Sequence, residues 1–212
     1  MNEFLSELIE VIALDTEHLN AFLSEGEQQY LDQKIVSRVK FEDEFYTNEE
    51  GDNLETLLHF LTCHKSEIIQ LLDDPSQSEL RLNLYTSSII SANYNCFRFD
   101  LGKFKQTYVP TGEVKTIYRV GRENETKDSL GNSWSKSHSG VKSYSLSSSI
   151  CAVSRPVFEA QINDSEILSE ISSTEDEFIL KKDFTVRSCR ELSDKEKYGG
   201  PHCQDSKPTN LS

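Results

Sequence analysis

Apolar residues recur at three- and four-residue steps through the first part of the chain, which is the spacing of helices with one apolar face. Two such stripes run from Phe4 to Ile12 and from Tyr30 to Val39. A longer stripe opens at Asp52 and ends before Pro75, because proline disfavours helix at the residue that precedes it. With a fourth helix over 79–93, the pattern predicts a small helical bundle within residues 1–95.

Near Asn95 the pattern changes to short runs of β-branched and aromatic residues, separated by Gly, Pro, Asn and Ser. The runs predict strands at Lys115–Val120, Ala152–Ile162, Glu177–Lys181 and Phe184–Ser188. The segment 136–140 is interpreted as a loop, 143–149 as a loop or helix cap, and 193–212 as a flexible tail without apolar periodicity. The fold class is therefore α+β, with an acidic helical region at 1–95 followed by a strand-rich core at 96–192.

The net charge of −14 is carried by the helical region alone. Residues 1–95 hold 19 Asp/Glu and 5 Lys/Arg, whereas residues 96–212 hold 17 of each. An acidic surface repels nucleic acid and attracts basic partners, so nucleic-acid binding is disfavoured. The carboxylates either dock a partner with a basic surface or only keep the bundle soluble, and the sequence leaves both readings open.

No run approaches the roughly 20 apolar residues that span a bilayer. The first residues carry Glu3, Glu7 and Glu10 where a secretory signal would be basic. We therefore expect a protein of the cytoplasm, either of the producing cell or of a host cell after delivery. The five cysteines show no paired spacing, which favours free thiols, and no close-spaced second pair completes a metal site with His59 and Cys63.

Three short features of the strand-rich part occur in an informative order. Tyr118-Arg119 lies in an apolar strand, Ser133-Trp-Ser135 follows, and Glu175-Asp-Glu177 leads directly into the apolar run 178–180. Each feature alone has an ordinary structural explanation: a surface ion pair, a loop with one buried ring, and a solvated turn.

In this order the features resemble the R–S–E class of mono-ADP-ribosyltransferases, the arginine-specific enzymes found among phage proteins, bacterial toxins and effectors, and vertebrate ecto-enzymes. The resemblance covers roughly residues 96–190. It implies a two-sheet, β-sandwich-like catalytic core, NAD⁺ as the substrate, and a target protein with an accessible arginine as the partner.

The resemblance also implies roles for individual residues. Arg119, which follows Tyr118, would grip the NAD⁺ pyrophosphate, since a guanidinium suits phosphate oxygens. Ser133 would brace the site and contact the nicotinamide-side ribose or Glu177, and Ser135 and Tyr118 would also belong to the NAD⁺-binding residues. Glu177 would bind the ribose 2′-hydroxyl and favour the oxocarbenium-like sugar.

Glu175 would orient the acceptor, and a carboxylate at that position suits arginine. It would share a face with Glu177 if the segment is extended. Two aromatic rings, Tyr144 and Phe158, are candidates to stack on nicotinamide. Arg122 is an alternative phosphate ligand to Arg119, and strand alternation points the two arginines to opposite faces.

Two other hypotheses remain at this point. An NAD⁺ glycohydrolase would use the same fold with water as the acceptor. An acidic helical adaptor would carry a non-catalytic C-terminal module that binds a partner.

Overall fold

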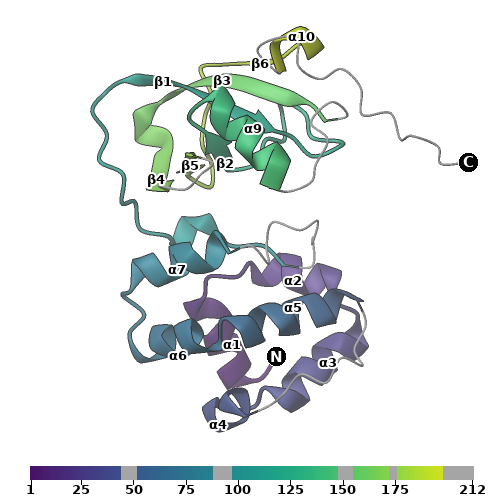
Figure 1. Cartoon of the computed structure of the whole chain (residues 1–212). Helices are drawn as coiled ribbons and strands as arrows, with labels where there is room; N and C mark the ends of the chain where they lie inside the picture. Colours follow the sequence, from purple (N-terminus) through teal and green to yellow (C-terminus); the bar gives the residue numbers. More distant parts are fainter. Residues whose placement is uncertain (44–51, 88–96, 148–154, 172–175, 198–212) are drawn as a thin grey trace, which may run out of the picture. The chain divides into compact units, whose positions relative to one another are not determined.

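The structure is a computed structural model that describes residues 1–43, 52–87, 97–147, 155–171 and 176–197. The chain divides into two compact units, Met1–Lys105 and Gln106–Ser212 (Figure 1). The first unit is helical and the second is built on an antiparallel sheet, so the predicted α+β class is confirmed.

The helical unit packs its apolar stripes into one core. Its helices are α1 (Glu3–Val11), α2 (Thr16–Phe22), α3 (Glu25–Lys34), α4 (Arg38–Glu42), α5 (Asp52–Cys63), α6 (Lys65–Asp73) and α7 (Ser78–Tyr85). Helix α1 begins at the cap Asn2, whose side chain accepts a hydrogen bond from the backbone N–H of Leu5 at 2.8 Å. Leu5, Leu8 and Ile12 are all buried, as the three- and four-residue spacing predicted.

The unit has more and shorter helices than the four that the stripes predicted. The stripe that ends at Val39 is divided, because α3 stops at Lys34 and α4 starts only at Arg38, which leaves Val39 67% exposed. The long stripe after Asp52 is likewise divided at His64 into α5 and α6. Helix α7 ends at Tyr85, and residues 88–93 of the predicted fourth helix lie outside the described residues.

The boundary between the units also lies further along the chain than the change of pattern at Asn95. Leu14 and Phe99 form an antiparallel bridge, and the backbone N–H groups of Asp15 and Asp100 donate to Arg98 O and Ala13 O, both at 2.7 Å. These bonds explain why residues 97–105 belong with the helices, although their composition resembles that of the strands.

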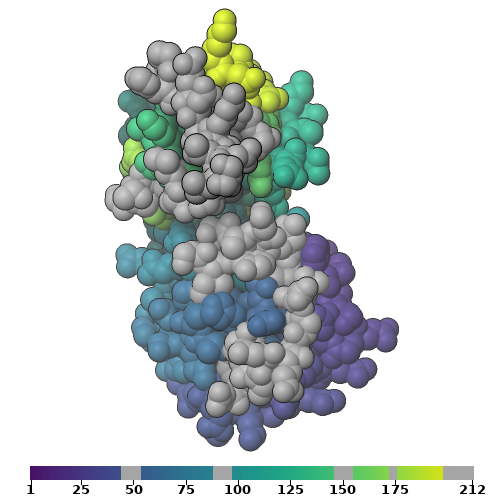
Figure 2. Space-filling model, turned by 45° about the vertical axis from the view of Figure 1, so that its right-hand side comes forward, coloured from purple at the N-terminus to yellow at the C-terminus, as the bar shows by residue number. Residues whose placement is uncertain are grey.

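The second unit contains one six-stranded antiparallel sheet in the order β4-β5-β2-β1-β3-β6. Its strands are β1 (Val114–Val120), β2 (Ser133–Ser135), β3 (Val157–Asn163), β4 (Ile167–Ile171), β5 (Glu177–Leu180) and β6 (Ser188–Glu191). Helix α9 (His138–Ser147) lies over one face of the sheet (Figure 1). The short helix α10 (Asp194–Lys197) has no buried residue, and its yellow atoms stand on the surface in Figure 2.

The junction between β1 and β2 is the weakest in the sheet. Strands β1 and β3 are registered over seven residue pairs, whereas β1 and β2 share the single pair Tyr118 and Ser135. The sheet therefore consists of two three-stranded halves, β4-β5-β2 and β1-β3-β6, that meet at one pair. All strands of the described residues belong to this one sheet, so the expected two-sheet arrangement remains a prediction.

Two local predictions were wrong. The segment 184–187 is not a strand: β6 begins at Ser188, and Phe184 instead packs edge-on against Trp134, with the ring centroids 6.4 Å apart. Helix α9 begins at His138, inside the segment 136–140 that was interpreted as a loop, and continues to Ser147. The low apolar content of this stretch hid a helix that buries Val141 against the sheet. The first residues of the predicted strand at 152–162 lie outside the described part.

Candidate functional site

One row of residues crosses the sheet through three of the predicted site positions. Tyr118 of β1 is paired with Ser135 of β2, and Ser135 is paired with Glu177 of β5. Directly opposed residues of antiparallel strands project from the same face, about 5 Å apart. Tyr118, Ser135 and Glu177 therefore share one face and lie next to one another, at the single pair that joins the two halves of the sheet.

The row continues on the other side of Tyr118 into charged residues. Tyr118 is paired with Glu159 of β3, and Glu159 with Arg190 of β6, whose Nε donates to Glu159 Oε1 at 2.8 Å. Arg190 Nη1 also donates to Glu196 at 2.7 Å. Partial burial, together with the nearby Glu159 carboxylate, raises the pKa of Tyr118.

Helix α9 supplies the aromatic side chains on this face. The His138 ring lies 4.2 Å from the Tyr118 ring, and Tyr144 packs in the same apolar cluster as Tyr118. Phe158 is 3% exposed and belongs to the core on the opposite face, with Ile117 and Trp134. Of the two candidates for stacking on nicotinamide, only Tyr144 is on the face of Glu177.

Trp134 does not disturb the face of the row. Trp134 lies between Ser133 and Ser135 in β2, so its side chain points to the opposite face of the sheet. There it is paired with Phe178 of β5 and is only 1% exposed. Its Nε1 donates to Gly131 O at 2.7 Å, which satisfies the one polar group of the ring. Ser133 is two residues from Ser135 in β2 and so projects from the same face as Ser135.

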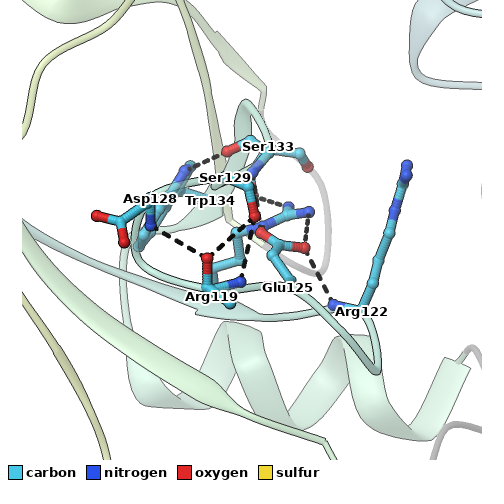
Figure 3. Close-up of polar contacts among 9 residues, drawn as sticks. Arg119, Arg122, Glu125, Asp128, Ser129, Ser133 and Trp134 are labelled. Atoms are coloured by element: carbon cyan, nitrogen blue, oxygen red, sulfur yellow. Dashed lines mark hydrogen bonds and ion pairs between the residues drawn. The ribbon is translucent and has the colours of Figure 1, made fainter.

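Arg119 projects from the other face and is fully engaged there (Figure 3). Its Nε and Nη2 donate to the two carboxylate oxygens of Glu125 at 2.6 and 3.0 Å, and its Nη1 donates to the backbone oxygen of Ser133 at 2.6 Å. The side chains of Arg119 and Glu125 are only 13% and 4% exposed. The structure therefore does not bring Arg119 together with Glu177, and its guanidinium is not presented to a phosphate.

Glu125 accepts several of the hydrogen bonds that order the loop between β1 and β2. It also accepts hydrogen bonds from the backbone N–H groups of Arg122 and Gly131, at 3.0 and 2.9 Å. Burial by itself would raise the pKa of Glu125, but the bonds from Arg119 and these two N–H groups outweigh it and lower the pKa. The Arg122 side chain points away from this cluster (Figure 3).

The backbone before Glu177 departs from the extended form on which the role of Glu175 depended. Asp176 has a φ of 50°, in the left-handed region, so this residue is not extended. Glu175 itself lies outside the described residues. The backbone N–H of Lys136 donates to Asp176 O at 2.8 Å and holds this turn.

Two residues of the site neighbourhood were missed by sequence reasoning, Glu125 and Lys136. Glu125 is one of several polar residues in a loop, and only the fold shows that it closes on Arg119. Lys136 directly follows Ser133-Trp-Ser135, and this adjacency was the one available signal.

No family model, curated protein or solved structure matches the chain. Within the described ranges no three His, Cys, Asp or Glu side chains gather as a metal site requires. No helix of the described part is long and apolar enough to cross a membrane.

Proposed function

We propose that the chain is a mono-ADP-ribosyltransferase that transfers ADP-ribose from NAD⁺ to an arginine of a target protein. The observation that carries this proposal is the row formed by Tyr118, Ser135 and Glu177. Three polar positions that are separated in sequence, and that the family resemblance assigns to one NAD⁺ site, are adjacent on one face of the sheet.

In this proposal the bond between nicotinamide nitrogen and ribose C1′ breaks, and its electron pair leaves with neutral nicotinamide. Glu177 binds the ribose 2′-hydroxyl, and this hydrogen bond strengthens as positive charge develops on the sugar. A nitrogen of the acceptor guanidine then bonds to C1′ and loses a proton to solvent or to a carboxylate. Ser135 and Ser133 hold the ribose side of the site, and Tyr144 is the ring proposed to stack on nicotinamide.

The proposal gives Arg119 an indirect role. Its three donor nitrogens bind Glu125 and Ser133 O, so Arg119 holds the backbone of β2 from the face opposite Glu177. Direct contact with the pyrophosphate would first require the buried ion pair with Glu125 to open. The weak junction between the two halves of the sheet supports the expected two-part core, with NAD⁺ bound where the halves meet.

The test is transfer from labelled NAD⁺ into proteins of a cell lysate, measured beside nicotinamide release. Glu177→Gln keeps the size of the side chain and removes its charge, and we expect it to abolish both signals. Glu191→Gln removes an exposed carboxylate of the same unit and serves as the matched control. Full labelling by Glu177→Gln would refute the proposal.

Two further outcomes separate the other hypotheses. Nicotinamide release without protein labelling would identify an NAD⁺ glycohydrolase in place of a transferase. A ligand that binds only the folded state must raise its stability. Absence of any thermal shift at millimolar NAD⁺ would therefore favour a non-catalytic adaptor.

A further inference from the structure

Lys136 connects three strands beside Glu177. Its Nζ donates to Glu170 Oε1 of β4 at 2.5 Å and to Asp176 Oδ1, immediately before β5, at 2.6 Å. Its own backbone continues β2, whose last residue Ser135 is paired with Glu177. The Lys136 side chain is 20% exposed, whereas the two carboxylates are about half exposed.

The contacts of Lys136 stabilise an unfavourable backbone conformation at Asp176. Left-handed φ is uncommon for residues other than glycine, although Asp tolerates it better than most. Lys136 holds Asp176 in this conformation twice, through its backbone N–H to Asp176 O and through Nζ to the Asp176 carboxylate. Because Asp176 is bonded directly to Glu177, its dihedral angles set where the Glu177 side chain begins.

The local environment keeps Lys136 charged and in place. Burial would lower the pKa of Lys136, but its hydrogen bonds to Asp176 and Glu170 outweigh burial, and the pKa is raised. Its Nζ also lies 5.2 Å from the centre of the Phe178 ring, within the range of a cation–π contact. Phe178 follows Glu177 in β5, so Lys136 contacts the residues on both sides of Glu177.

We propose that Lys136 is a positioning residue, which fixes the carboxylate of Glu177 for cleavage of NAD⁺ by holding Asp176 in its left-handed turn. This inference rests on the proposed function, since it presumes that Glu177 acts on NAD⁺. Lys136 itself touches neither the ribose nor the nicotinamide in this proposal.

The test compares Lys136→Met, Lys136→Arg and a control, Lys142→Met, an exposed lysine of α9. Methionine keeps the apolar stem beside Phe178 and removes both ion pairs, whereas arginine can form them again. Steady-state nicotinamide release gives kcat and the KM for NAD⁺. Fluorescence of Trp134, the one tryptophan of the chain, reports whether the unit is folded.

We expect Lys136→Met to lower kcat by about tenfold to 10²-fold with little change in KM, since a displacement of about 1 Å can cost this much in rate. Lys136→Arg should recover most of the loss, and Lys142→Met should match the wild type. An unchanged kcat, or an equal loss in the arginine variant, would overturn the inference. A wild-type chain that releases no nicotinamide would instead overturn the proposed function, so the two failures are distinguishable.

Discussion

Replacing Glu125 by glutamine should strongly destabilise the strand-rich unit, because Glu125 is the buried partner of Arg119. The substitution leaves the Arg119 guanidinium, 13% exposed, without its carboxylate, and it places an amide NH₂ among donors. Removing one partner of a buried ion pair costs about 3–5 kcal/mol of folding free energy. Because Arg119 keeps some contact with water, we expect a loss at the lower end, about 3 kcal/mol.

The assay is chemical denaturation followed by Trp134 fluorescence. Trp134 is the one tryptophan of the chain, is 1% exposed, and donates to Gly131 O within the same loop. The signal therefore reports on the second unit even if the helical unit unfolds separately. Glu123→Gln makes the same change of charge at an exposed position in the same loop and should alter the free energy of unfolding by less than about 0.5 kcal/mol.

A double-mutant cycle measures the interaction energy between Arg119 and Glu125. If the charges of Arg119 and Glu125 stabilise each other, Arg119→Gln with Glu125→Gln should cost less than the sum of the two single changes, by at least about 2 kcal/mol. Additive losses would refute the reasoning, because they would show that the guanidinium and the carboxylate act independently. So would a loss below about 1 kcal/mol for Glu125→Gln alone.

The same pair predicts a dependence on pH. The pKa of Glu125 lies below its ordinary value of 4.5 in the folded chain. Its contribution is therefore complete above the unfolded pKa and is lost as the pH falls through the lower, folded pKa. The stability gap between wild type and Glu125→Gln should be constant from about pH 5.5 to 8 and shrink in stronger acid. A gap that widens in acid would contradict this.

Two other substitutions test the packing of the separate units. Gly131→Ala would place a Cβ 2.3 Å from Arg119 Nη2, so we expect a loss of about 1–3 kcal/mol by Trp134 fluorescence, and no loss would show that Arg119 can move aside. Asn2→Ala removes the cap of α1 and the donations from Asn2 Nδ2 to Asp32 O and Ile35 O. About 2 kcal/mol should be lost from the helical transition by circular dichroism, and an unchanged transition would contradict the capping role.

The sequence predicted the elements whose burial has a clear period. The stripes around Leu5 and Leu58 form buried helices, and the apolar run around Ile117 forms the long strand β1. Helix breaks at His64 and after Lys34 were not predictable, because a stripe of apolar residues continues through both and only the packing of the core decides where each helix turns. Helix α9 was missed because four of its ten residues are serine and its few apolar residues show no clear period, and Val141 is buried only by the packing of the helix against the sheet.

The residues named for the candidate NAD⁺ site stay a prediction, and the sequence did not indicate how they are arranged on the sheet. The order of Tyr118, Ser135 and Glu177 along the chain indicated one site, and the register of β1, β2 and β5 places them in one row. Side chains of successive strand residues point to opposite faces, so Tyr118 and Arg119 cannot both join that row. Which of the two shares the face of Glu177 is decided by the register of β1, β2 and β5, which the sequence does not show.

The sequence by itself determined the α+β class and the concentration of negative charge on the helical part, since these depend on local periodicity and composition. The tertiary structure decided which carboxylate meets which cation. Glu125 holds Arg119, and Lys136 holds Asp176 beside Glu177. The physical reason is that an ion pair needs two groups within about 4 Å. For Lys136 and Asp176, 40 residues apart, that distance is set by strand order and register, and for Arg119 and Glu125, six residues apart, by the folded path of the loop after β1.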